Sequence, residues 1–225
     1  MICIKTLKIF LRVFKYLGCG QSPRHVINDV LLTDKKISDE KKQEFLVKNR
    51  KELERIEWLV TSLLKMSRLD SGSETLKIKE VKMGNLIKKV LEPLEIPIEL
   101  KNQELVLDYD ANLLLHIDLN WTAEAMINIL KNAYEHTPEN GKISIISKDT
   151  PIYTEINITD NGIGIDSSDL PHIFERFYKG KHNKESIGIG LHMAKKIIHL
   201  EKGEIEVTSN SKGTTFHIKF YKQNL

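Results

Sequence analysis

The stretch TDNGIGID, residues 159–166, gives the clearest indication of the fold, because it joins a segment rich in isoleucine to a turn with two glycines. The preceding segment is typical of a β-strand, and it leads directly into Asp160. Gly162 and Gly164 allow the backbone to turn tightly and to come close to a ligand. A carboxylate at the end of a buried strand can accept a hydrogen bond from an exocyclic amine such as that of adenine. The alternative is a plain turn, which Asp-Asn-Gly sequences often form.

A second stretch, EAMINILKNAYEH at residues 124–136, has the apolar pattern of a helix. It places Asn128 and Asn132 four residues apart, which puts both amides on one helical face. Such amides must find partners or line a cavity, and an amide oxygen suits Mg²⁺. The alternative is two ordinary exposed asparagines.

A third stretch, ESIGIGLHMAKKI at residues 185–197, has two glycines ahead of an amphipathic helix. The free N–H groups of a helix N-terminus can bind phosphate oxygens. The stretch is not a Walker loop, because no lysine and hydroxyl residue follow its glycines. Before it, FERFYKGKHNK (174–184) places Lys179, Lys181 and Lys184 near the expected phosphates, unless this is only a solvated basic loop.

The rest of the C-terminal region, residues 73–225, alternates between strand and helix patterns. The expected strands are Leu76–Lys79, Leu105–Asp108, His116–Asp118, Lys142–Ser147, Tyr153–Thr159, Glu204–Thr208 and Thr214–Tyr221. The expected helices are Met83–Leu91, Trp121–Glu135, Ser168–Phe174 and Ile189–Leu200. This pattern predicts the α+β class, as an α/β sandwich.

Two regions precede this domain. Residues 1–36 read as an irregular, amphipathic N-terminal segment, and residues 37–72 as one helix of a dimerisation hairpin. Ser38 is a suitable N-cap for a helix that runs to Leu69. Its later apolar residues follow three-four spacing, so the helix needs a partner helix or a second subunit, and we expect a homodimer.

Composition excludes several classes of protein. The net charge of +3 over 225 residues gives no case for nucleic-acid binding. Two cysteines exclude a disulfide framework and fit a cytoplasmic protein. Four basic residues interrupt the apolar stretch 2–17, which is therefore no transmembrane helix. As a basic amphipathic helix it is a candidate for peripheral contact with an anionic membrane; the alternatives are a helix packed on a partner subunit or a remnant of a longer protein.

Taken together, the motifs resemble those of the catalytic domain of sensor histidine kinases. That family belongs to the ATPase superfamily of DNA gyrase, the Hsp90 chaperones and MutL. INILKNAYEHT resembles the N box, DNGIGI the G1 box, FERFYKG the F box, SIGIGL the G2 box and KGTTF the G3 box. The resemblance covers about residues 38–222, and Ser186 replaces the first glycine of the usual G2 pattern.

The resemblance implies ATP and Mg²⁺ as cofactors. Asn132 is then the Mg²⁺ ligand, and Asp160 the residue that reads adenine. Asn128 occupies a position where some relatives in the superfamily have a catalytic Glu, and Lys179 lies at the start of a mobile lid, so both are assigned to catalysis. The other implied nucleotide contacts are Glu135, His136, Gly162, Gly164, Ile165, Arg176, Gly188, Gly190, Leu191 and Thr214, with Thr215 as the alternative to Thr214.

Members of this family phosphorylate a histidine on the first hairpin helix and pass the phosphoryl group to an aspartate of a response regulator, which is the implied partner. That first helix is not recognisable here. His25, in SPRHVINDV, is the candidate acceptor, but valine follows it and no proline comes after. Between His25 and residue 36 there is room for about three helical turns.

Three functions therefore stay open. The first is a two-component protein-histidine kinase, either truncated or lacking its own acceptor histidine. The second is an ATP-binding dimerisation or regulatory module without autophosphorylation. The third is a chaperone or DNA-repair ATPase, against which the long helix before the domain argues.

Overall fold

The structure, a computed structural model, describes residues 38–180 and 187–222. The expectations for residues 1–36, including His25 and the segment 2–17, lie outside the described residues, as do Lys181 and Lys184. The chain divides into two compact units, residues 1–74 and 75–225, each of which is described by itself. The finer division of the first unit stays a prediction.

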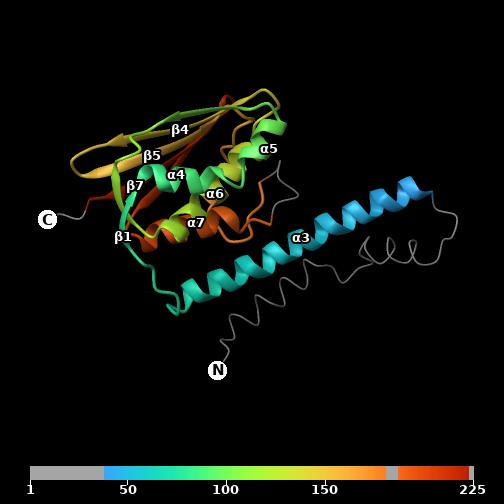
Figure 1. Ribbon diagram of the computed structural model, residues 1–225, viewed down its shortest axis with the longest axis horizontal. Helices are drawn as coiled ribbons and strands as arrows, with labels where there is room; N and C mark the ends of the chain where they lie inside the picture. The colour runs from blue at the N-terminus through green and yellow to red at the C-terminus, as the bar shows by residue number, and fades with distance from the viewer. Residues whose placement is uncertain (1–37, 181–186, 223–225) are drawn as a thin grey trace. The chain divides into compact units, whose positions relative to one another are not determined.

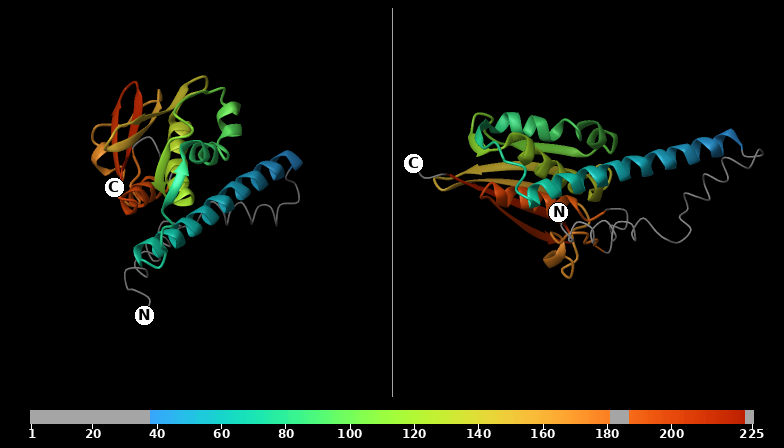
Figure 2. Two further views of the ribbon diagram at one scale, coloured as in Figure 1. Left: turned by 60° about the vertical axis from the view of Figure 1, so that its left-hand side comes forward. Right: turned by 90° about the horizontal axis from the view of Figure 1, so that it is seen from below.

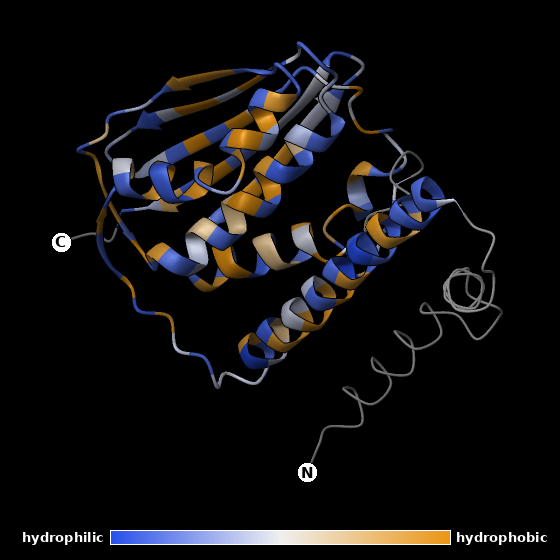
Figure 3. Ribbon diagram, turned by 45° about the vertical axis from the view of Figure 1, so that its right-hand side comes forward, coloured by the Kyte–Doolittle hydropathy of each residue, from blue (hydrophilic) through white to orange (hydrophobic). Residues whose placement is uncertain are grey.

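Helix α3 (Asp39–Asp70) dominates the first unit. It begins as expected, because the Ser38 hydroxyl accepts a hydrogen bond from the N–H of Lys41 at 3.4 Å. Its exposed large apolar residues include three at a spacing of seven and a fourth four residues later: Leu46, Leu53, Val60 and Leu64. Apolar and polar residues alternate along the helix in Figure 3. None of the described helices is long and apolar enough to cross a membrane.

The second unit contains a five-stranded sheet in the order β2-β4-β5-β7-β6 and a two-stranded sheet of β1 and β3. Only β2 and β4 pair in parallel; the other neighbours are antiparallel. The strands are β1 (Lys79–Lys82), β2 (Glu104–Asp108), β3 (Leu114–Ile117), β4 (Lys142–Asp149), β5 (Tyr153–Asp160), β6 (Glu204–Asn210) and β7 (Gly213–Tyr221). The helices are α4 (Met83–Leu91), α5 (Glu95–Leu100), α6 (Leu119–His136) and α7 (Gly190–Leu200).

Helices α4, α6 and α7 cover one face of the large sheet (Figures 1 and 2). Alternate residues of β5 and β7 are buried, as strand geometry requires when one face is covered. Ile156, Ile158 and Ile218 are completely buried on that face. Facing them, α6 contributes Met126 and Ile129, so the core lies between the helical layer and the sheet.

The expected α+β class is confirmed, and the expected helix Met83–Leu91 has those same bounds. The expected strands 76–79 and 116–118 were misplaced: β1 and β3 occupy Lys79–Lys82 and Leu114–Ile117. The residue ranges of the two strands are fixed by their pairing with each other, in which Lys79 lies opposite Ile117. The sequence of either strand alone does not reveal this pairing.

The expected helix Ser168–Phe174 was wrong. Only a 3₁₀ turn is present, at Leu170–His172. Pro171 lacks a backbone N–H and disfavours a helical conformation in the residue before it, so the segment does not propagate as an α-helix. Helix α5 was missed, because its sequence EIPIEL is short and contains a proline.

Replacing Ile158 by alanine tests the packing of this core. Ile158 is completely buried at the centre of the sheet, so Ile158→Ala should lower the free energy of unfolding by about 2–5 kcal/mol in urea denaturation. Ile152→Ala is the control: Ile152 is 67% exposed in the turn before β5 and should change it by less than about 0.5 kcal/mol. Equal effects at the two positions would contradict the described core.

Candidate functional site

Helix α6 supplies one side of the candidate site. Asn128, Asn132 and His136 follow one another at intervals of four and therefore share a face. Asn128 is buried, and its amide nitrogen donates to the carbonyl of Glu124 at 3.0 Å. Its amide oxygen lies so close to Gly190 that a Cβ at Gly190 would be 3.2 Å away. Asn132 and His136 are half-buried.

Asp160, at the end of β5, lies near the last turn of this helix. Its carboxylate is buried and accepts a hydrogen bond from the N–H of Gly162 at 2.9 Å. Burial raises the pKa of Asp160 above its ordinary value, while backbone N–H groups of Gly162 and Thr214 and the nearby charge of His136 oppose the rise. The site thus contains a buried acceptor at the end of a strand.

Glycines let the loop after Asp160 approach its neighbours. A Cβ at Gly162 would lie 2.4 Å from the carbonyl oxygen of His136. Gly164 has a φ of +72°, and a Cβ there would meet the carbonyl oxygen of Asn210 at 1.9 Å. Gly213 lies against Asp160 in the same way, with a φ of +135° and 1.9 Å to its carbonyl oxygen. Only glycine fits these three positions.

The second glycine-rich segment lies at the start of α7. Gly188 has a φ of +73°, and its carbonyl accepts a hydrogen bond from the N–H of Phe177 at 2.7 Å. A Cβ at Gly188 would be 2.1 Å from the carbonyl oxygen of Tyr178. Gly190 is the first residue of α7, so the unpaired N–H groups of the first helical turn begin beside Asn128.

Aromatic residues hold the segment between β5 and α7. The ring of Phe174 makes an edge-to-face contact with Phe216, their centroids 6.3 Å apart. The carbonyl of Phe174 is 2.9 Å from Nδ1 of His192 in α7. The Tyr178 hydroxyl donates to Asp169 at 2.8 Å, and this hydrogen bond raises the pKa of Tyr178. Phe174 therefore ties the segment to β7 and α7, and the Tyr178–Asp169 bond closes a loop within it.

The other predicted residues vary in their placement. Thr214 is buried opposite Asp160 in the β5–β7 pair, and its hydroxyl is 2.9 Å from that of Ser209. The N–H of Ile165 donates to the Ser209 hydroxyl at 2.8 Å. Leu191, Arg176 and Lys179 are half-buried, the guanidinium of Arg176 lying 5.2 Å from the Phe177 ring centroid. Glu135 is exposed and lies 3.8 Å from Lys131, so it is the least enclosed of the set.

Sequence reasoning missed the residues that fix the end of α6. Lys101 donates to the carbonyl of Tyr134 at 2.9 Å, and Gln103 donates to that of Thr137 at 2.8 Å. These carbonyls have no partners within the helix, so the two side chains cap it. No signal in the sequence indicates this, because both residues lie more than thirty positions before the carbonyls to which they donate.

The donor set fits a nucleotide with Mg²⁺ better than a metal bound by protein alone. The described residues contain no group of three or more His, Cys, Asp or Glu that could hold a metal ion. Mg²⁺ beside phosphates takes few protein oxygen ligands and keeps several waters, and the amide of Asn132 can supply one ligand.

Comparisons with known proteins agree with this geometry. Residues 117–224 match the family described as histidine kinase-, DNA gyrase B- and HSP90-like ATPase. The sensor histidine kinase YclK of Bacillus subtilis is 28% identical over 207 residues, which are 88% of this chain and 44% of YclK. The heme sensor protein HssS of Staphylococcus haemolyticus is 32% identical over 175 residues, 74% of this chain and 36% of HssS. The chain thus spans less than half the length of these relatives.

Solved structures show the same likeness. The catalytic domain of histidine kinase ThkA superposes with a TM-score of 0.60 at 26% identity, over 65% of this chain and 97% of that one. ThkA in complex with the response regulator protein TrrA gives 0.77 at 25% identity, over 96% of this chain and 61% of that one.

Residues 117–224 therefore form a domain of the histidine kinase-, gyrase- and HSP90-like ATPase family. Within that class, the chain carries the ATP-binding domain of a histidine kinase.

Alanine at Gly188 should damage the site more than alanine at Gly190. Gly188→Ala combines a positive φ with a clash against backbone, and we expect a loss of more than about 2 kcal/mol in unfolding free energy. Gly190→Ala meets only a side chain at 3.2 Å in a helical position and should cost less. Thermal unfolding of both variants measures the difference. The reverse order of stability would rule out the described turn at Gly188.

Proposed function

We propose that this chain is an ATP- and Mg²⁺-dependent protein-histidine kinase of a two-component system, with a response regulator as its partner. The observation that carries the proposal is the approach of Asn128 to Gly190, in the same domain where Gly162 lies against the end of α6 beside Asp160. The N, G1 and G2 motifs thus meet at one site. The likeness to ThkA, solved with a response regulator, supports the choice of partner.

In this proposal Asp160 binds the base. Its buried carboxylate already accepts a hydrogen bond from the backbone N–H of Gly162, and its two oxygens have capacity for a further donor such as the exocyclic amine of adenine. Gly162, Gly164 and Ile165 shape this end of the site, with Thr214 behind Asp160. His136 lies at the end of α6 beside the same loop, and Glu135 is its exposed neighbour.

The phosphates lie at the other end of the proposed site. Gly188, Gly190 and Leu191 place the first N–H groups of α7 there, where the positive end of the helix dipole favours an anion. Asn132 would bind Mg²⁺, which neutralises phosphate charge when it is present. Arg176 and Lys179 contribute positive charge from the segment before α7.

Phosphoryl transfer requires mainly positioning and neutralisation of charge. Asn128 positions the start of α7 and does not activate a reacting group. Its buried amide nitrogen donates to the carbonyl of Glu124, and its amide oxygen faces Gly190. Lys179 is the proposed cation for the transferring group. The acceptor is an imidazole nitrogen, and His25 is the candidate in this chain.

Asp160→Asn tests the binding step. The amide has the same shape but presents N–H donors, so a donor on the base would lose its acceptor, and ADP affinity should fall at least about tenfold in calorimetric titration. Asp108→Asn, at the exposed end of β2, is the matched control and should bind as the unaltered chain does. Equal affinity in all three proteins would refute the assigned role of Asp160.

Incubation with γ-labelled ATP separates the kinase from the alternatives. We expect acid-labile label on the protein, absent in His25→Ala. Nucleotide binding without label would favour the second candidate, an ATP-binding dimerisation or regulatory module. Steady release of phosphate without a phosphoprotein would indicate a chaperone or DNA-repair ATPase.

Helix α3 is the proposed dimerisation element, because its exposed apolar residues repeat at the spacing of a helical bundle seam. Leu53→Lys, at a residue that is 66% exposed, should shift the chain toward monomer in sedimentation equilibrium. Thr61→Lys adds the same charge to the same helix outside that repeat and should leave the dimer unchanged. A monomeric unaltered chain would refute this element of the proposal.

A further inference from the structure

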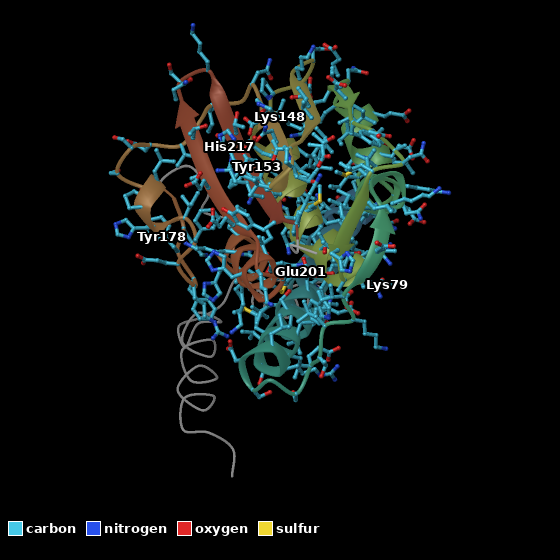
Figure 4. All side chains as sticks on the ribbon, turned by 90° about the vertical axis from the view of Figure 1, so that its left-hand side faces the viewer. Lys79, Lys148, Tyr153, Tyr178, Glu201 and His217 are labelled. Atoms are coloured by element: carbon cyan, nitrogen blue, oxygen red, sulfur yellow. The ribbon has the colours of Figure 1, made fainter. Side chains whose placement is uncertain are left out.

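Glu201, directly after α7, belongs to a polar cluster away from the candidate site. In Figure 4 it lies apart from Tyr178, which belongs to the segment between β5 and α7. One of its carboxyl oxygens accepts a hydrogen bond from the backbone N–H of Asp118 at 2.8 Å. The hydroxyl of Thr122 lies 2.8 Å from both oxygens. Glu201 therefore joins the end of α7 to the start of α6.

Asp118 is the N-cap of α6, and its carboxylate accepts further hydrogen bonds. Its carboxylate accepts hydrogen bonds from the N–H groups of Asn120 and Trp121 at 3.0 and 3.2 Å. Its other oxygen accepts from the N–H of Lys77, just before β1, at 2.7 Å. The cluster thus fastens three segments, and Asp118 is the acidic group that faces Glu201 from α6. The side chains of Lys77 and Lys202 are exposed.

The hydrogen bonds of Thr122 depend on the proton of Glu201. A hydroxyl has one hydrogen, yet the Thr122 oxygen lies 2.8 Å from the Asp118 carbonyl as well as from Glu201. When Glu201 is protonated, its O–H can donate to Thr122, which then donates to the Asp118 carbonyl. When Glu201 is ionised, Thr122 can bond only one of them, and two negative carboxylates face each other.

Burial raises the pKa of Glu201 from its ordinary value of 4.5 to about 7, and the charge of Asp118 adds to the rise. The hydrogen bonds from Asp118 and Thr122 oppose it. Because the folded-state pKa is the higher one, the folded chain holds the extra proton. The stability contributed by this cluster is therefore full below about pH 4.5 and is lost as pH rises to about 7.

The two ends of α7 both meet α6. Glu201 meets Asp118 and Thr122 at one end, and Gly190 meets Asn128 at the other. The 11 residues of α7 span about 16 Å as a helix. Helix α7 therefore links Glu201 directly to Gly190 and to the proposed phosphate site.

We propose that Glu201 is a positioning residue of the nucleotide site, which holds α7 against the start of α6 more firmly when it carries a proton. The inference rests on the proposed nucleotide binding. The affinity of the site for nucleotide would then depend on pH near neutrality, because of the protonation of Glu201, which lies outside the site. Deprotonation adds repulsion between Glu201 and Asp118, which loosens α7 and weakens binding.

The test is ADP binding to the full chain by calorimetry at about pH 6 and about pH 8, compared between variants. ADP titrates in this range itself, so the difference between proteins is the measured quantity. Glu201→Gln keeps a donor for Thr122 and an acceptor for Asp118 without a charge. We expect the affinity of the unaltered chain to fall about fivefold more than that of Glu201→Gln as pH rises. Glu99→Gln, an exposed glutamate of α5, should behave as the unaltered chain.

Carbon NMR of the glutamate carboxyl groups tests the same coupling without a substitution. Linkage is reciprocal, so ADP must raise the titration midpoint of Glu201 by about 0.7 pH units if the affinity change is fivefold. An unmoved midpoint, or identical pH profiles for the unaltered chain and Glu201→Gln, would overturn the inference while binding itself stands. No ADP binding at either pH would overturn the proposed function, and this inference with it.

Discussion

The close approach of the loop 160–164 to the last turn of α6 is the constraint on which the site depends. Gly162 lies against the carbonyl of His136, where any Cβ would be 2.4 Å from the oxygen. That contact sets the distance between Asp160 and the face of α6 that carries Asn132. Because Lys101 and Gln103 bond the carbonyls at the end of α6, the helix presents a fixed surface to the loop. Both walls of the site are therefore rigid backbone rather than adjustable side chains.

Strands β6 and β7 contact the loop 160–164 on the side opposite α6. Gly213 lies against the carbonyl of Asp160, so β7 supports the loop from behind, and Ser209 of β6 bonds the N–H of Ile165. Asp160 is thus held between a helix and a strand end, both built on the same buried layer of isoleucines. A change of packing in that layer would reach the carboxylate directly, since the polar residue continues the strand that forms the core.

Much of this was predictable from the sequence, and the limits have physical causes. The motifs around Asn128, Asp160 and Gly188 are local, because glycines and helical spacing act over a few residues, and the structure brings them to one site. The shifts of β1 and β3 arise from their mutual pairing, which no single segment reveals. The expected helix at residues 168–174 is replaced by a 3₁₀ turn because Pro171 interrupts the segment. Lys101, Gln103 and Glu201 were missed because their partners lie about 30 to 80 positions away.

The contact between Gly190 and Asn128 also bears on how this domain can diverge. A side chain at one position takes the space that the other needs, since a Cβ at Gly190 would lie 3.2 Å from the Asn128 amide oxygen. Substitutions there are not independent: a side chain at position 190 requires the Asn128 amide to shift by a few tenths of an ångström, so its cost depends on the residue at position 128. One contact therefore couples the evolution of α6 to that of the start of α7.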